Sequence, residues 1–254
     1  MASEFPILEF DPSREALIEP SRVVARADVP EHCVLCFFGD VVAAIGESER
    51  ARRAGQLRWE HGSHPLFELE MDGRRVLFYQ PGVGAPLVVG LAEEVIAKGC
   101  RKLIACGGAG VLDGSLAVGR PIIPTAAVRD EGTSYHYLPP GRLAEPSPEA
   151  VAAIEAVLRE RGIDFVSGTT WTTDAPYRET PGKIERRRAE GCLTVEMEAA
   201  SLFALARFRG VTLGQVLYAG DDVSGSEWDR RGWQDRRPVR EQLFWIAVEA
   251  CLRL

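Results

Sequence analysis

The alternation of short apolar runs with longer stretches of helical periodicity is the feature that most constrains the fold of this chain. The runs that have the length and composition of buried strands are Cys33–Phe38, Lys102–Cys106, Pro121–Val128, Asp164–Thr170, Leu193–Glu196 and Gln215–Ala219. The segments with helical spacing of apolar residues are Asp40–Ala54, Leu87–Lys98, Pro148–Arg161, Pro181–Glu190, Glu198–Phe208 and Pro238–Leu252. Strands that alternate with helices in this way predict an α/β domain.

A hairpin signal makes the expected sheet mixed rather than purely parallel. Alternating residues in Phe67–Met71 and Arg74–Tyr79 flank Asp72-Gly73, which favours a tight turn between antiparallel strands. We therefore expect a twisted mixed sheet flanked by helices. No repeat or linker divides the chain, so residues 1–254 are read as a single domain. Within it, residues 1–32 form an irregular N-terminal arm and residues 222–237 a polar loop that could act as a lid.

Composition places the chain among ordinary globular proteins. Hydrophobic residues make up 46% and charged residues 26%, and the net charge of −7 disfavours a nucleic-acid partner. No segment approaches the roughly 20 apolar residues that span a bilayer, and the N-terminus lacks a signal-peptide pattern. We therefore expect a cytoplasmic protein with its six cysteines reduced. Cys33 and Cys36 form a C-x-x-C, but within a strand they would face opposite sides, which favours buried structural thiols.

Glycines follow three of the predicted strands and could bring backbone N–H groups close to an anion. They are Gly39, the pair Gly82 and Gly84, and the run Gly107, Gly108 and Gly110. In open α/β sheets, ligands bind beyond the carboxyl ends of the strands. A tight turn would need glycine in any case. None of these segments matches a dinucleotide or nucleoside-triphosphate motif.

Two acids flank a methionine where an apolar helix begins. Glu196, Met197 and Glu198 have almost wholly apolar residues on either side, so these carboxyls are expected to be buried, which is costly without a partner. An acid at a helix N-terminus also complements the helix dipole, which is a purely structural explanation. Two hydrogen-bond acceptors beside an adaptable thioether suit a sugar. Both explanations stay open at this point.

A further acid, Asp221, follows a buried strand and Gly220. A carboxyl group in such a place is expected to have a raised pKa, as a general acid near neutral pH requires, and the neighbouring Asp222 is expected to raise it further. The alternative is that Asp221 caps the next turn.

These segments together resemble the purine nucleoside phosphorylase/uridine phosphorylase superfamily. The specific part is the sequence TVEMEAA at 194–200 with Asp221 at its spacing downstream. Supporting similarities are TTDAPY at 172–177, DEGTSYH at 130–136, GVG at 82–84 and the glycines of 107–110. The resemblance covers the chain from about residue 33 to its end.

The resemblance implies one α/β domain, a homo-oligomer built from dimers (up to a hexamer) and cleavage of the N-glycosidic bond of a nucleoside. Members transfer the ribosyl group to phosphate or, in the nucleosidases, to water. By position it places Glu198, Met197 and His64 at the ribose, and Glu196, Tyr177, Thr172 and Thr173 at the base. Asp221 would protonate a purine base at N7, and Gly39, Gly84, Gly107 and Gly108 would surround the phosphate or water. It implies no cofactor, with phosphate as a co-substrate, and no nucleic-acid or membrane partner.

The chain departs from this family at its phosphate-binding arginines. The expected positions hold Ala43 and Ala105, and the segment 61–64 contains no arginine. The glutamate that positions water in nucleosidases has no clear counterpart, since Glu47 is displaced. Phosphorolysis of a purine nucleoside is the leading hypothesis. Hydrolysis and non-catalytic nucleoside binding are the alternatives.

Two further patterns are interpreted as structural. His61 and His64 form an H-x-x-H, but a metal site would need more ligands, so none is expected. The loop 227–237 mixes tryptophan with arginine as nucleic-acid binders do. Its interleaved acids and the acidic chain favour a solvated loop or lid.

Overall fold

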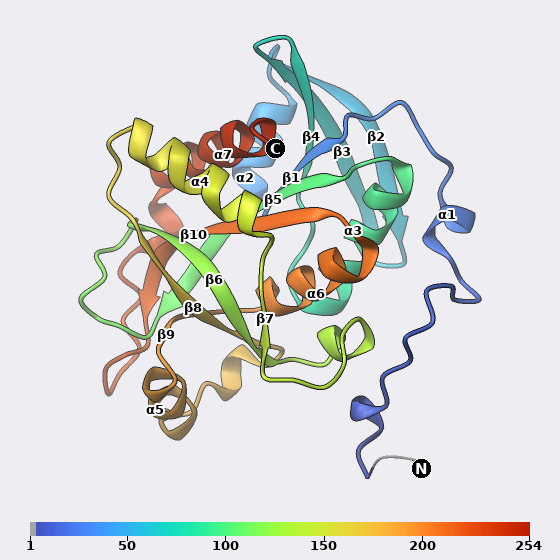
Figure 1. The fold of residues 1–254 in the computed structure, drawn as a ribbon. Helices are drawn as coiled ribbons and strands as arrows, with labels where there is room; N and C mark the ends of the chain where they lie inside the picture. Colours follow the sequence, from blue (N-terminus) through green and yellow to red (C-terminus); the bar gives the residue numbers. More distant parts are fainter. Residues whose placement is uncertain (1–3) are drawn as a thin grey trace.

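The computed structural model describes residues 4–254 and has a single α/β domain built on one mixed sheet (Figure 1). The strands are β1 (His32–Cys36), β2 (Ala51–Trp59), β3 (Gly62–Met71), β4 (Arg74–Tyr79), β5 (Lys102–Val111), β6 (Pro121–Asp130), β7 (Leu143–Ala144), β8 (Val166–Thr173), β9 (Cys192–Glu196) and β10 (Thr212–Asp222). The helices are α1 (Pro20–Val23), α2 (Gly39–Gly46), α3 (Ala85–Lys98), α4 (Pro148–Glu160), α5 (Pro181–Ala189), α6 (Ala199–Arg209) and α7 (Arg237–Leu252). Short 3-10 turns lie at Pro6–Leu8, Thr133–His136, Pro176–Arg178 and Trp233–Asp235.

Part of the sheet closes on itself. The strands follow the order β10-β6-β8-β9-β5-β1-β4-β3-β2, and an additional pairing between β10 and β5 joins the first five into a ring. Strand β5 is central to this closure, because it pairs in parallel with β1 and β10 and antiparallel with β9 at its last residues. The ends of β5, β9 and β10 therefore lie together.

Two apolar cores cover the two faces of the sheet. One contains Cys36 with residues of α2, α4 and α7, and the other contains Cys33 with residues of α3 and α6. Figure 1 shows the same division, with α2, α4 and α7 on one side of β5 and β10 and α3 and α6 on the other. The two thiols of the C-x-x-C thus point into opposite cores, and all six cysteines are buried and free.

The hairpin is confirmed, whereas the helix expected to run to Ala54 is wrong. Strands β3 and β4 pair antiparallel around Asp72 and Gly73, whose φ values of 53° and 73° are those of a tight turn. Helix α2 ends at Gly46, which packs against Phe67 so closely that an added Cβ would lie 2.7 Å from its ring. The chain then returns as β2, paired with β3 through a bulge at Gly55.

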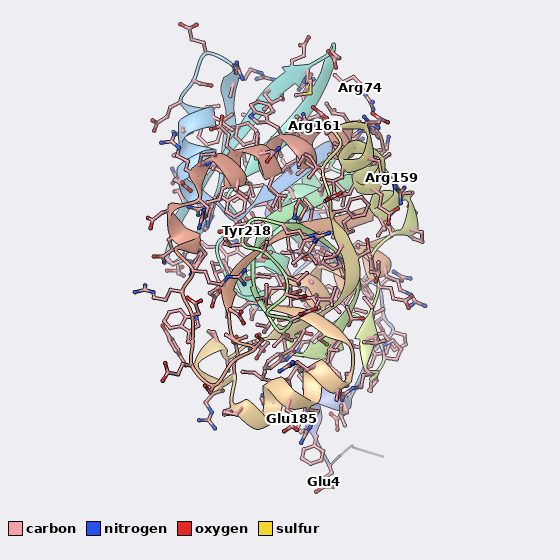
Figure 2. The ribbon with its side chains drawn as sticks, turned by 90° about the vertical axis from the view of Figure 1, so that its left-hand side faces the viewer. Glu4, Arg74, Arg159, Arg161, Glu185 and Tyr218 are labelled. Carbon is pink, nitrogen blue, oxygen red and sulfur yellow. The ribbon has the colours of Figure 1, made fainter. Side chains whose placement is uncertain are left out.

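Several strands extend further than the apolar runs indicate. Gly107, Gly108 and Gly110 lie inside β5 rather than in a turn after it. The reason is close packing, because a Cβ on Gly107 would lie 3.0 Å from Phe37 and one on Gly108 would lie 3.1 Å from Tyr218, labelled near the middle of Figure 2. Asp221 likewise belongs to the end of β10.

The N-terminal arm lies beside α3 and α6. The Arg14 guanidinium stacks 4.8 Å from the centre of the Phe208 ring, and Glu19 pairs with Arg209 at 3.5 Å. The first three residues of the expected arm fall outside the described part of the chain. Within residues 4–254, no helix has both the length and the apolar composition needed to cross a membrane.

Candidate active site

A cavity of about 350 Å³ opens where β5, β9 and β10 end. Its wall carries carboxyl groups from three parts of the chain and one guanidinium. They belong to Glu179, Glu196, Glu198, Asp221 and Arg240. Met197 lines the same cavity, as do Gly107 and Gly108. The fold therefore gathers the acids that sequence analysis singled out into one enclosure.

Glu196 closes the N-terminus of α6 with its side chain. Its Oε2 accepts hydrogen bonds from the backbone N–H groups of Glu198 and Ala199, both at 2.7 Å, and its Oε1 accepts one from the Thr172 hydroxyl at 2.6 Å. Burial raises the pKa of the Glu196 carboxyl to about 7 despite these bonds. Helix capping thus accounts for Glu196, although the residue also faces the cavity.

Glu198 is buried with a different set of partners. Its Oε1 accepts a hydrogen bond from the Gly84 N–H at 2.6 Å, which ties the glycine loop before α3 to the start of α6. Burial, and then the neighbouring Glu196, raise the pKa of the Glu198 carboxyl to about 8. No cation forms an ion pair with it within residues 4–254. Its carboxyl is available to a ligand that supplies hydrogen-bond donors.

Asp221 meets the polar loop that follows it. Its Oδ2 accepts a hydrogen bond from the Trp228 indole N–H at 2.6 Å. The loop is folded back by paired backbone hydrogen bonds between Asp222 and Asp229, at 2.8 and 3.0 Å. The start of the loop 222–237 therefore lies against Asp221 at one end of the cavity.

Glu179 is a site residue that sequence analysis missed. It follows the turn Pro176–Arg178 and lines the cavity together with Asp221. Burial, and then the charge of Asp221, raise the pKa of its carboxyl to about 7. Its place two residues after Tyr177, in a segment already assigned to the base pocket, was the available signal.

Arg240 and Gln215 are also new to the site. The Arg240 guanidinium lies 3.1 Å from the Asp40 carboxylate and 4.8 Å from the centre of the Phe38 ring, and its Nε is buried without a hydrogen-bond partner among the described residues. Gln215 is 1% exposed, and its Oε1 also has no partner there. Gln215 stands opposite Ala105 in the β5–β10 register, so an amide lies beside one of the positions without arginine.

A second cavity of about 360 Å³ holds His64 and Gly39. Nδ1 of His64 lies 3.1 Å from the Gln80 carbonyl oxygen. Because a carbonyl can only accept, Nδ1–H of His64 is the donor. The Nε2 of His64 then accepts from the Nε2–H of His61 at 2.7 Å. Glu47 and Ala43 line the same cavity, and no arginine does.

The structure leaves some predicted site residues away from the main cavity. Tyr177 is 100% exposed and does not line the cavity, whereas Pro176 and Glu179 of the same segment do. Thr172 and Thr173 are buried in β8, where Thr172 is bonded to Glu196 and Thr173 to the Ala175 N–H. Gly84 contributes its N–H to Glu198. Their roles toward a ligand stay predictions. Among residues 4–254, no three His, Cys, Asp or Glu side chains are grouped to hold a metal ion.

The protein is thus an α/β protein whose partly closed sheet carries an acidic cavity at the ends of its strands. Comparison with known proteins identifies its family. The family model described as the phosphorylase superfamily matches residues 31–253, so this chain belongs to that superfamily. The resemblance found in the sequence is thereby confirmed.

The names of individual relatives indicate that they act on different bases. A guanosine phosphorylase from Halorubrum lacusprofundi is 27% identical over 169 residues, 66% of this chain and 70% of the relative. A uridine phosphorylase from Escherichia coli is 26% identical over 208 residues, 76% of this chain and 81% of the relative. The crystal structure of a purine nucleoside phosphorylase from Toxoplasma gondii has a TM-score of 0.76 at 22% identity, covering 89% of this chain and 92% of that one, which supports the fold.

Proposed function

We propose that this protein cleaves the N-glycosidic bond of a purine nucleoside and transfers the ribosyl group to phosphate. The observation that carries the proposal is the set of acids in the wall of one cavity, with Glu198 next to Met197 in sequence and Glu179 within electrostatic reach of Asp221. The volume of about 350 Å³ lies within the range of roughly 300–1,000 Å³ typical of small-molecule sites.

Glu198 is suited to the ribose. Adjacent sugar hydroxyls are paired donors, and they would give the buried Glu198 carboxyl the partners that it lacks in the protein. Met197 supplies an apolar contact for the face of the sugar ring. As the sugar becomes oxocarbenium-like during cleavage, a nearby carboxylate would stabilise its positive charge.

The acids Glu179 and Asp221 support a purine base. A departing base carries negative charge unless it is protonated, and N7 of a purine accepts such a proton. Asp221 stands where the family resemblance places this acid, and Glu179 adds a second carboxyl beside it. Two acids at the base favour a leaving group that needs a proton.

The start of α2 and Arg240 support phosphate as the acceptor. Helix α2 has no side-chain hydrogen bond capping its N-terminus, so backbone N–H groups near Gly39 are open to an anion. Arg240 pairs with Asp40 in the first turn of this helix and could supply the cationic contact.

Water is the second candidate acceptor. The specific observation in its favour is the neutral amide of Gln215 beside Ala105, together with a second cavity that has no arginine in its wall. A cavity wall without a cation fits water better than a phosphate dianion.

One experiment tests the function and both acceptors. Inosine, guanosine, adenosine and uridine are incubated with the protein with and without phosphate, and the base and sugar products are separated by chromatography. Purine release with ribose 1-phosphate supports the proposal, and phosphate-independent release of free ribose supports the hydrolase. Saturable binding of a nucleoside without release of any base would contradict both.

A further inference from the structure

The two carboxyls at the base end of the cavity have different partners. Asp221 accepts the 2.6 Å hydrogen bond from the Trp228 indole, and the Asp222–Asp229 pairing holds the loop that carries this tryptophan. Within residues 4–254, the carboxyl of Glu179 accepts no hydrogen bond and forms no ion pair. One acid is therefore supplied with a donor and its neighbour is not.

This difference decides where charge and proton reside. An indole N–H can only donate, so the Trp228 bond matches a carboxylate oxygen of Asp221, which can only accept. The acid without a donor lies in the same cavity beside that charge, which favours its protonated form. Burial and the charge of Asp221 raise the pKa of Glu179 to about 7, in agreement with the geometry.

The other charged groups around Glu179 do not reverse this assignment. Glu196 and Glu198, from the junction of β9 and α6, add acids to the cavity wall. Arg240 from α7 is paired with Asp40, and Lys183 from α5 is paired with Asp130. Arg178, next in sequence, is exposed.

We propose that the Glu179 carboxyl donates the proton to the leaving base, while Asp221, held by Trp228, remains its charged partner. Glu179 is then a catalytic residue and Trp228 a positioning residue. This inference rests on the proposed function, and it moves the proton donor from Asp221 to a residue with no assigned role.

The proton transfer balances with either acceptor. The C1′–N9 bond breaks and its electron pair moves into the base, while the O–H bond of Glu179 breaks and an N7–H bond forms. An oxygen of phosphate or water bonds to C1′. The proton that this acceptor releases restores the Glu179 carboxyl, and the charge of Asp221 favours that return.

The test compares substrates that need the proton with one that does not. Initial rates are measured for the wild type, Glu179→Gln and Asp221→Asn with inosine, guanosine and 7-methylguanosine, from pH 5.5 to 8.5. In 7-methylguanosine, N7 already carries a methyl group and a positive charge, so its base leaves without protonation. Glu185→Gln is the matched control, because Glu185 is an exposed residue of α5 (Figure 2). Thermal unfolding of each variant checks the fold.

Glu179→Gln should lower the rate with inosine and guanosine by about 100-fold or more and the rate with 7-methylguanosine by about threefold or less, as loss of a general acid predicts. The wild-type rate with inosine should fall as pH rises above about 7, and Glu179→Gln should lack this fall. Asp221→Asn removes the neighbouring charge, so the fall should move to lower pH.

Two results would overturn the inference. If Glu179→Gln cleaves inosine and guanosine at the wild-type rate while Asp221→Asn does not, the proton comes from Asp221, and the proposed function stands. If the wild type cleaves neither nucleoside, the proposed function fails and this inference fails with it.

Discussion

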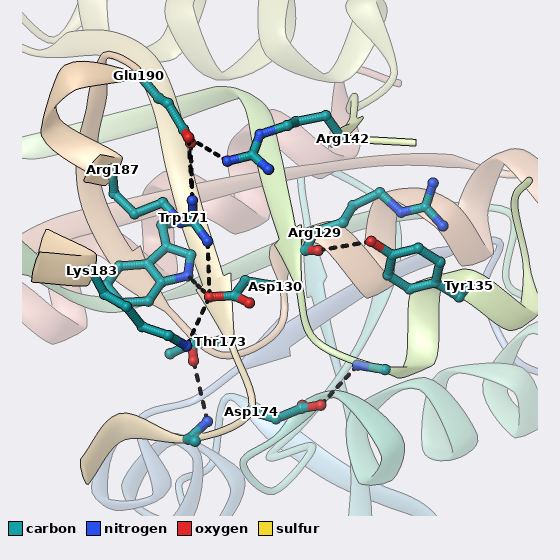
Figure 3. Close-up of polar contacts among 12 residues, drawn as sticks. Arg129, Asp130, Tyr135, Arg142, Trp171, Thr173, Asp174, Lys183, Arg187 and Glu190 are labelled. Carbon is teal, nitrogen blue, oxygen red and sulfur yellow. Dashed lines mark hydrogen bonds and ion pairs between the residues drawn. The ribbon is translucent and has the colours of Figure 1, made fainter. Parts of the chain in front are cut away.

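Two groups of carboxyls in this protein differ in whether cations offset the effect of burial on their pKa values. Asp130, at the end of β6, accepts hydrogen bonds on one oxygen from the Trp171 indole at 3.0 Å, Lys183 at 3.2 Å and Arg187 at 3.0 Å (Figure 3). Burial acts against its charge, but the bonds from Arg187 and Lys183 hold the pKa of Asp130 below its usual value. In the candidate site Glu196 and Glu198 are buried and Glu179 and Asp221 half-buried, and none of these four forms an ion pair within residues 4–254.

The difference separates a structural carboxyl, Asp130, from the carboxyls that we propose act on a substrate. Asp130 fixes α5 to β6 and β8, and Arg187 continues the network to Glu190 at 3.2 Å (Figure 3). Glu198 and Glu179 have pKa values raised to about 8 and about 7, because burial is not offset by a positive charge. An enclosed acid without a cationic partner is a cost to the free protein that a ligand or a proton can remove.

The largest expected effect comes from Glu198→Gln. If the carboxyl binds the ribose hydroxyls, losing two hydrogen bonds to a charged group would cost about 3–6 kcal/mol, or about 100-fold or more in kcat/KM. The melting temperature should not fall, since glutamine keeps an oxygen for the Gly84 N–H and replaces a carboxyl whose burial raises its pKa. Steady-state kinetics and thermal unfolding measure the two effects. Full activity with a lower melting temperature would place Glu198 in the same class as Asp130.

Asp130→Asn should show the reverse behaviour. It leaves Arg187, whose side chain is 7% exposed, without its main partner, and removing one member of a buried ion pair costs about 3–5 kcal/mol. Because the Asp130 side chain is 29% exposed, solvent screening reduces the expected loss of unfolding free energy to about 2–3 kcal/mol. Denaturant unfolding measures it against Asp164→Asn, the same change at an exposed site. A loss of kcat/KM with unchanged stability would remove the distinction between the two groups.

Arg240 is an intermediate case, a cation in the wall of the site itself. Arg240→Gln should raise the KM for phosphate by about tenfold, since one charge-assisted contact contributes about 1.5 kcal/mol. The KM for the nucleoside should stay unchanged, and Arg207→Gln, on the exposed face of α6, serves as the control. A raised KM for the nucleoside instead would assign Arg240 to the base or sugar.

The site residues that the sequence predicted all lie in recognisable local sequence patterns. Glu196, Met197 and Glu198 are contiguous, and Asp221 lies at the end of a buried strand, so local pattern and family resemblance placed them in the cavity wall. The ring closure between β5 and β10 brings these segments together. The α/β class and the hairpin followed from periodicity and the Asp-Gly turn for the same local reason.

The missed parts depend on distant packing. Arg240 enters the site from the last helix, because α7 packs beside α2 and pairs with Asp40. No spacing near Gly39 indicates this. Residues 47–54 have helical spacing, but 47–50 form a turn and 51–54 begin β2, since the edge of the hairpin offers paired hydrogen bonds from Ala51 onward and Arg52 reaches Glu68 at 2.7 Å. Tertiary contacts overrode local propensity there.

The most gradual expected effect is the pH dependence of stability, which resolves the two groups in one measurement. The folded-state pKa of Glu198 and Glu196 lies above the usual value, so the folded protein binds more protons and stability falls as pH rises from about 4.5 to about 8. Each group adds a slope of about 1 kcal/mol per pH unit or less. Asp130 has a lowered pKa, so its contribution is present above about pH 4 and is lost as pH falls below that value.

Melting temperatures from pH 3 to pH 9 should therefore show a maximum between these windows. Glu198→Gln should flatten the neutral side alone and Asp130→Asn the acid side alone. If Glu198→Gln flattened the acid side and Asp130→Asn the neutral side, the cations beside Asp130 would not explain why the pKa values of the two groups shift in opposite directions.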